Sequence, residues 1–86
     1  MCSWIVEKAD IHGSGKGPQG WFALNRANVC YDHPIHVQLD HAVLIDFVNE
    51  RQGPGARVAV ELSADSARGL IRAIEAALET GAGLHG

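Results

Sequence analysis

The strongest pattern in this 86-residue sequence is a run of apolar residues at helical spacing over residues 63–80. Leucine, isoleucine and alanine recur there every three or four positions, which places them on one side of a helix, with charged residues opposite. Ser63 suits the N-cap, and Asp65 complements the positive end of the helix dipole. The pattern predicts a helix over 64–80 whose apolar stripe must be covered. The stripe consists of Ala67, Leu70, Ile71, Ile74, Ala77 and Leu78.

Another sector of the same predicted helix carries the small residues Gly69, Ala73 and Ala76. A glycine inside a helix costs about 1 kcal/mol relative to alanine, so Gly69 predicts that another backbone approaches closely at this sector. Gly81 and Gly83 follow the last periodic residue and predict the end of the helix.

Four segments before the helix have the residue types and alternation of β-strands. The first and second are separated by residues 13–20, a stretch of glycines that predicts a flexible hairpin loop. The third is nearly all apolar, which predicts a central strand with both faces covered. The predicted fold is α+β with order β-β-β-β-α: a four-stranded antiparallel sheet with the helix packed on one face. The strands are expected at 3–12, 21–31, 41–49 and 57–62.

Length and charge limit the classes of function. A chain of 86 residues supports one hydrophobic core, so residues 1–86 are expected to form a single domain. The net charge of −3, without any run of lysine or arginine, disfavours nucleic acid as a partner. No apolar run approaches the roughly 18 residues that a membrane span needs. Two cysteines and an amino terminus without signal-peptide features predict a cytoplasmic protein with reduced thiols.

The segment between the second and third predicted strands contains three histidines, His33, His36 and His41, spaced as H-x-x-H-x4-H. Imidazole is the commonest metal ligand in proteins, so these three predict a site for a divalent transition metal, zinc or iron, with Asp32 or Asp40 orienting the rings. The spacing fits no rigid helix face. Histidines that cap the connection or hydrogen-bond across a subunit interface explain the same pattern without a metal.

Two charged residues inside predicted strands offer a second site. Arg26 and Asp46 would form an ion pair if their strands were neighbours, lining a pocket or lying on the sheet surface. One alternative function is therefore a metal-free oligomeric module that binds a small ligand between subunits through Arg26, Asp46 and a histidine. A second alternative is acid–base catalysis without metal. The candidate catalytic residues are His33, Asp32, Arg26 and Asp46.

A single helix covers only one face of a four-stranded sheet. The other face would leave a large apolar patch in water, and patches of that size mark interfaces. We therefore expect a homodimer or a higher symmetric oligomer.

Four stretches of the sequence carry a resemblance to a known family. They are the start MCxWIVEK, the segment GKGPxGWF, the segment YDHP and the final VAVELSxxSAxxL. Together they resemble a family of short uncharacterised actinobacterial proteins described as a domain of unknown function. The resemblance covers nearly the whole chain and implies a complete, stand-alone protein. It carries no activity, cofactor or catalytic residue to transfer.

Overall fold

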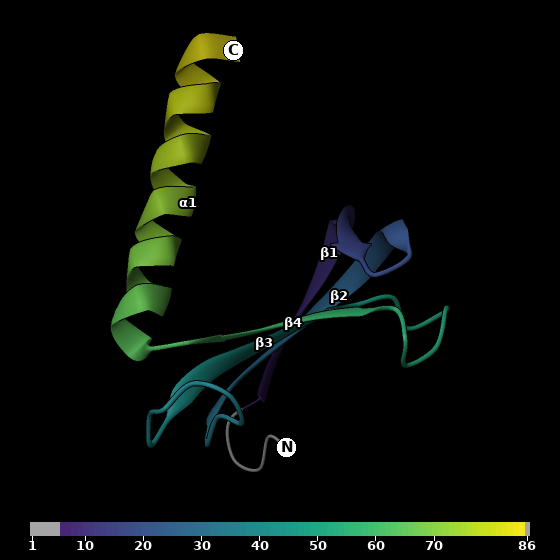
Figure 1. Cartoon of the computed structure of the whole chain (residues 1–86). Coiled ribbons are helices and arrows are strands. Elements are labelled where there is room, and N and C mark those ends of the chain that lie inside the picture. Colours follow the sequence, from purple (N-terminus) through teal and green to yellow (C-terminus); the bar gives the residue numbers. More distant parts are fainter. Residues whose placement is uncertain (1–5, 86) are drawn as a thin grey trace.

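A computed structural model describes residues 6–85 of the chain (Figure 1). The four strands are all antiparallel to their neighbours and lie in the order β1-β2-β3-β4, followed by one C-terminal helix, α1. The predicted α+β fold class and order of elements are therefore confirmed. The elements are β1 (Val6–Gly17), β2 (Gly20–Asp32), β3 (Ala42–Val48), β4 (Arg57–Leu62) and α1 (Ala64–His85).

The glycine-rich stretch at 13–20 is strand rather than the predicted flexible loop. Only Pro18 and Gln19 form the turn, and Gly17 pairs with Gly20, whose φ of 112° favours glycine. Gly15 leaves room for Leu24, because a Cβ at this position would lie 3.0 Å from Cδ1 of Leu24. The glycines thus let two strands pair tightly over a buried leucine.

The β1–β2 hairpin bends partway along its length. The register shifts between Asp10 and Gly13, where β1 has one residue more than β2. Such a bulge bends and twists a hairpin. Beyond the bulge the hairpin end rises from one side of β3 and β4 (Figure 1), and a Cβ at Gly15 would also come within 3.3 Å of Val58 in β4. We call residues 13–24 the hairpin arm.

Strand register divides the sheet into two chemically distinct faces. Side chains alternate between faces along each strand, and directly paired residues share a face. In β2, β3 and β4, every second residue lies on an apolar face, and the residues between them lie on a polar face. The apolar face carries Ala27, Val29, Tyr31, Val43, Ile45, Phe47, Val58, Val60 and Leu62. The other face, which we call the polar face, carries Arg26, Asn28, Asp32, Asp46, Arg57 and Glu61 together with Cys30, Ala42, Leu44, Val48 and Ala59.

Helix α1 begins where the sequence predicts and ends later. The Ser63 hydroxyl accepts a hydrogen bond from the Ser66 N–H at 3.1 Å, and the Ser63 carbonyl accepts one from the Ala67 N–H at 2.9 Å. Ser63 is therefore the N-cap. The helix then continues beyond residue 80, through Gly81 and Gly83, to His85. A glycine lowers helix stability without preventing helical geometry, which is why these two do not end it.

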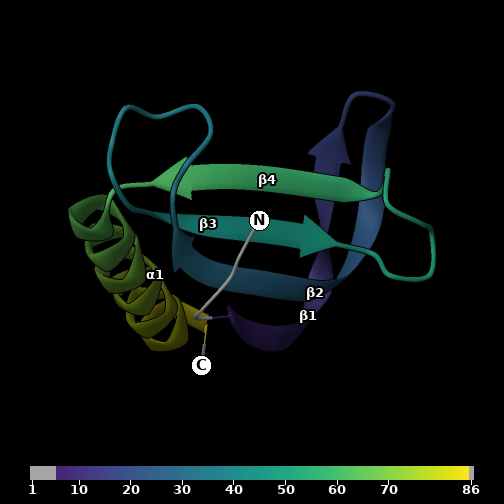
Figure 2. The same cartoon turned by 90° about the horizontal axis from the view of Figure 1, so that it is seen from below.

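The helix lies over the apolar side of the sheet only at its first turns. Ala64, Ala67 and Ile71 line an apolar corner with three sheet residues, and the rest of α1 extends away from the strands (Figures 1 and 2). The prediction that the stripe packs on the sheet is therefore wrong beyond this corner. A single residue, Ser63, separates β4 from α1, too short a link for the helix to turn back over the sheet. The sheet residues of the corner are Val29, Tyr31 and Val43.

The hydrophobic core is small as a result. Only Leu24, Ala27, Cys30 and Ala42 are buried apolar residues among those described, and no large side chain among them is fully enclosed. Strand β3 is central, as predicted, but residues 43–48 are half-buried, so its faces are not both covered. The helix that should cover one of them stands away from it.

Cys30 is disulfide-bonded. The prediction of reduced thiols is therefore wrong for this residue. The chain has one other cysteine, Cys2, which lies outside the described residues. A disulfide restricts the unfolded chain and adds stability where a small core supplies little.

Candidate functional site

The connection between β2 and β3, residues 33–41, is held in place by one carboxylate. Glu61 of β4 accepts hydrogen bonds from three consecutive backbone N–H groups, those of Ile35 at 3.0 Å, His36 at 2.9 Å and Val37 at 3.0 Å. These hydrogen bonds, first of all the one from Ile35, lower the pKa of Glu61 to about 2. Partial burial acts in the opposite direction and would raise the pKa. The histidine segment is thus an anchored loop.

Two of the three histidines come together at the root of this loop. The rings of His33 and His41 have centroids 4.7 Å apart, and His41 stacks on Tyr31 with centroids 5.4 Å apart. Nδ1 of His33 lies 2.7 Å from the backbone carbonyl oxygen of Asp40. With the proton on Nδ1 this contact is a hydrogen bond that orients the ring and leaves Nε2 as an acceptor.

The third histidine, His36, contacts Glu61. Nδ1 of His36 lies 3.4 Å from Oε2 of Glu61, and its side chain is largely exposed. Within the described residues, no three histidine, cysteine, aspartate or glutamate side chains form a group that could hold a metal ion. The structure therefore brings together His33 and His41, and it places His36 with Glu61.

Each of the two aspartates that precede a histidine makes a contact with His33 that involves the main chain. The carboxylate of Asp32 accepts the N–H of His33 at 2.7 Å, and Asp32 is itself buried. Asp40 contacts the His33 ring through its carbonyl oxygen and not through its carboxylate. The part of Asp40 that contacts the His33 ring is therefore its main chain, and an orienting role at a metal site stays a prediction.

Arg26 and Asp46 share the polar face but do not pair with each other. Nη2 of Arg26 lies 3.0 Å from Oδ1 of Asp10, and Nη1 lies 3.6 Å from Glu50. Asp46 pairs with Arg57, at 2.7 Å from Nη2. The hypothetical Arg26–Asp46 ion pair is therefore wrong. Register with β3 does not distinguish the two arginines, because Arg26 and Arg57 both lie opposite Val48. Arg26 also lies directly opposite Asp10 in β1, and Asp10 is the carboxylate that it contacts.

A pocket of about 480 Å³ opens on the polar face beside the turn that joins β3 to β4. Oδ1 of Asp46 accepts from both Nε and Nη2 of Arg57, at 2.8 and 2.7 Å. Nearby on the same face, Nε of Arg26 and Oδ1 of Asn28 are buried without a hydrogen-bond partner among the described residues. We call this site the β3–β4 pocket. Its lining is Asn28, Asp46, Val48, Asn49, Glu50, Gly53, Pro54 and Arg57.

The histidine pair and the β3–β4 pocket lie at opposite ends of the sheet. Asp32, next to His33, pairs with Ala42, whereas Arg26 pairs with Val48. Six residues of strand separate these positions, about 20 Å at the usual rise per residue. The predicted combination of Arg26, Asp46 and a histidine around one ligand is therefore not assembled within one described chain.

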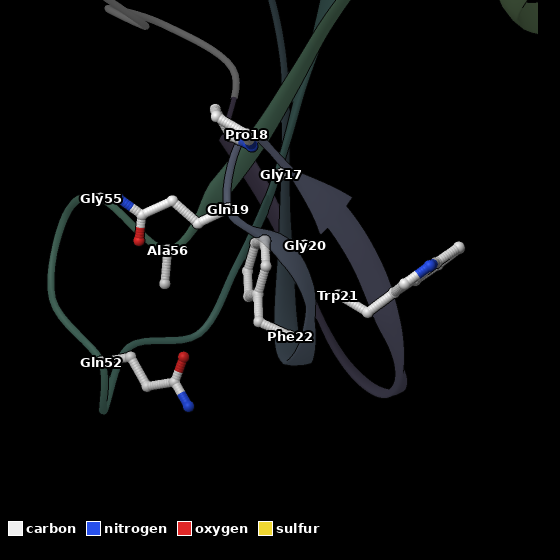
Figure 3. Close-up of a pocket in the computed structure, with 9 residues that line it drawn as sticks. All are labelled: Gly17, Pro18, Gln19, Gly20, Trp21, Phe22, Gln52, Gly55 and Ala56. Atoms are coloured by element: carbon white, nitrogen blue, oxygen red, sulfur yellow. The ribbon is translucent and has the colours of Figure 1, made fainter.

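A further cavity of about 480 Å³ lies between the turn of the hairpin arm and the β3–β4 turn (Figure 3). Its polar side chains are the uncharged amides of Gln19 and Gln52, and Trp21 points away from both. Trp21 is 71% exposed. This cavity contains none of the predicted site residues and no titratable group.

Several contributors to these sites were not predicted from the sequence. In the sequence, Glu61 has the pattern of an ordinary polar position in an alternating strand. Its three hydrogen bonds come from a loop that is 24 or more residues distant. Asn49 carried a usable signal, because asparagine favours turns by bonding nearby backbone. Its Oδ1 accepts the Arg51 N–H at 3.0 Å, and its Nδ2 donates to Ala23 at 3.0 Å.

Fold and site together define a small α+β domain with an anchored histidine loop and a polar pocket. The chain belongs to a family of unknown function, DUF6295, whose model matches residues 1–84. The resemblance to a domain of unknown function is therefore confirmed. No curated protein and no solved structure matches the chain. Among the described residues, no helix is long and apolar enough to cross a membrane.

Proposed function

We propose that this protein is a metal-free binding module that holds a small polar ligand in the β3–β4 pocket. The observation that carries the proposal is the pair of buried atoms without a partner, Nε of Arg26 and Oδ1 of Asn28. Leaving such a group unpaired costs about 1–3 kcal/mol, and native proteins contain few of them. Asn28 lines the pocket, and Arg26 is two residues away on the same face of β2. An unpaired donor and an unpaired acceptor on one face suit a site whose groups find partners in another state.

The charges around the pocket indicate the chemistry of the ligand. Both contacts from Arg57 go to Oδ1 of Asp46, so Oδ2 accepts no hydrogen bond from the described residues. A ligand with an N–H or O–H group would donate to this oxygen. Its carbonyl or carboxylate would accept from a guanidinium. Amides, amino acids and hydroxy acids have both groups, and a pocket with two arginines and two carboxylates in or beside its wall has no strong preference for net charge.

Amide NMR with a library of such molecules at millimolar concentration tests the proposal. A true ligand should shift the resonances of Asn28, Asp46 and Asn49, and Asn28→Ala should weaken its binding about tenfold, the effect of one good hydrogen bond. Gln52→Ala is the matched control, because it truncates an exposed amide of the same turn outside this pocket. Equal affinity of wild type and Asn28→Ala would remove the pocket from consideration.

The histidine pair supports a second candidate, a site for zinc or iron. The rings of His33 and His41 lie together, and the Asp40 carbonyl is the kind of second partner that fixes a metal-ligating imidazole. Two histidines are a partial ligand set for zinc, which takes four ligands. His36 would have to leave Glu61 to act as the third.

Metal analysis of protein purified without an affinity tag distinguishes this candidate. Zinc or iron should be present in the wild type and absent from His33→Ala and His41→Ala. His12→Ala is the control, since it removes an imidazole from β1, outside the loop. Absence of metal from the wild type after growth in metal-supplemented medium, or equal content in all variants, ends the metal hypothesis. Acid–base catalysis by one histidine stays a prediction, and no substrate is indicated.

A cytoplasmic location also stays a prediction. The disulfide at Cys30 weighs against it, because structural disulfides persist mainly in oxidising compartments. Titration of free thiols in protein isolated from its natural host under alkylating conditions decides the question. Two free thiols per chain support the cytoplasm, and none supports an oxidising compartment.

A further inference from the structure

One side of the molecule presents aliphatic side chains that nothing in the described chain covers. Along α1, Leu70, Ile74 and Leu78 are 44%, 50% and 69% exposed. The apolar face of the sheet lies on the same side, and its residues from β3 and β4 are only half-buried. We propose that a second copy of this chain covers both, with α1 of each protomer packed on the apolar face of the other.

The exposed area of the chain is that of a protomer and not of a compact monomer. It exposes 6667 Å² at a mass of 9.2 kDa, whereas a compact monomer of this mass exposes about 4,900 Å². The difference of about 1,700 Å² per chain exceeds the roughly 800 Å² per partner of a standard interface and falls in the range of obligate dimers. The radius of gyration, 14.4 Å, likewise exceeds the roughly 12 Å of a compact domain of this length.

A second copy is the occupant because this chain supplies both halves of one complementary surface. The helix and the hairpin arm project from the same side of β3 and β4 (Figure 1). The partner's helix would lie on the sheet between them. In a dimer with a two-fold axis, the stripe of each helix would cover the apolar sheet face of the other chain. Symmetry repeats each contact, so both stripes and both faces would be buried at once. A foreign protein would need one surface for the stripe and another for the sheet.

The corner between α1 and the sheet marks where the partner's side chains enter. It encloses about 470 Å³ and is lined by apolar side chains apart from Arg68 and the Tyr31 hydroxyl. Arg68 is held at the rim by Asp65, at 3.3 Å. The opposite side of α1 mixes arginine and glutamate and would remain in water, as the outer side of an interface helix does.

Sedimentation velocity on the full chain, with one charge placed on either side of α1, tests the proposal. Ile74→Glu puts a carboxylate in the centre of the stripe and should raise the dimer dissociation constant by about 100-fold or more, as expected for a central interface residue. Ala76→Glu adds the same charge about 160° around the helix and should leave the dimer intact. A monomeric wild type at 100 µM would overturn the proposal, and so would dissociation by Ala76→Glu alone, which would place the contact on the small-residue sector.

A second measurement does not depend on the variants folding. In a dimer mixed from isotope-labelled and unlabelled wild-type chains, filtered NOE spectra should show contacts between Ile74 methyls of one chain and Val60 methyls of the other. Such cross-peaks support the exchange of helices. If every contact between these two residues is within one chain, the helix closes on its own sheet and the proposal is wrong.

Discussion

The two faces of the sheet differ in how far the chain itself completes them. On the polar face, charged groups find partners inside the chain: Arg57 with Asp46, and Glu61 with the loop at 35–37. On the apolar face, residues from three strands meet the helix only at its first turns. Hydrogen bonds and ion pairs can be satisfied one at a time by single side chains, whereas an apolar surface needs a surface of similar size. A short chain therefore completes most of its polar contacts first, although Nε of Arg26 and Oδ1 of Asn28 have no hydrogen-bond partner among the described residues.

The largest expected effect concerns the disulfide bond of Cys30. Replacement Cys30→Ser should lower the free energy of unfolding by about 2–5 kcal/mol, because the small core offers little to replace the lost restriction of the unfolded chain. Urea denaturation of oxidised wild type and variant measures it. The reduced wild type is the control and should match the variant; a stability equal to that of the oxidised wild type would contradict the prediction.

The contrast between faces is tested most directly on neighbouring residues of β4. Val60→Lys places a charge on the apolar face and should cost about 2–3 kcal/mol of stability, because this face would be buried in the proposed dimer. Ala59→Lys adds the same side chain on the polar face, at an exposed position, and should change stability by no more than about 0.5 kcal/mol. Denaturation curves at several protein concentrations compare them. Equal effects would show that the two faces are equally solvated.

Acid should release the loop on the polar face before it affects the apolar face. The pKa of Glu61 in the folded chain is about 2, below its unfolded value. Its stabilisation is therefore complete above roughly pH 4.5, the ordinary range for a carboxyl, and is lost as the pH falls towards 2. Amide exchange at Ile35 and Val37 should rise in that window, beyond the intrinsic pH effect. In Glu61→Gln this excess should be absent; its persistence would assign it to another group.

The smallest expected effect lies on the back of the helix. A Cβ added at Gly69 meets nothing within 4 Å, so no described residue supplies the close backbone predicted at this position. Gly69→Ala should therefore raise the free energy of unfolding by about 0.5–1 kcal/mol, the difference in helix propensity. Thermal denaturation measures it. A loss of stability, or of the dimer, would indicate that a partner's backbone does approach at Gly69.

Local sequence patterns predicted the helix and the strands. The features that they did not predict depend on contacts between residues distant in sequence. Alternation placed β4 at 57–62, and the Ser63 cap placed the helix start, because both signals are carried by adjacent residues. The glycines at 13–17 favour a loop when considered alone. Their strand geometry depends on Leu24 and Val58, which approach too closely for a side chain at Gly15.

The sites show the same division. Spacing identified the histidine segment but not which histidines meet, since that depends on Glu61 binding the backbone at 35–37. The sequence also marked Arg26 and Asp46 as charged residues inside strands, but it did not show their partners. The contact of Arg26 with Asp10 depends on the register of β1 with β2, which local patterns do not reveal. The direction of the helix was missed because no local signal distinguishes a helix that covers its own sheet from one that covers a neighbour's.

The single residue between β4 and α1 would also make the proposed dimer sensitive to small changes. The 22 residues of α1 span about 33 Å from Ser63 to the far end. A rotation of only about 10° at that joint would displace the far end by about 6 Å, more than one helical turn. Substitutions near Ser63 can therefore redirect the whole helix with hardly any change to the sheet. Within this family, altered subunit geometry should map to this joint before it maps to the surfaces in contact.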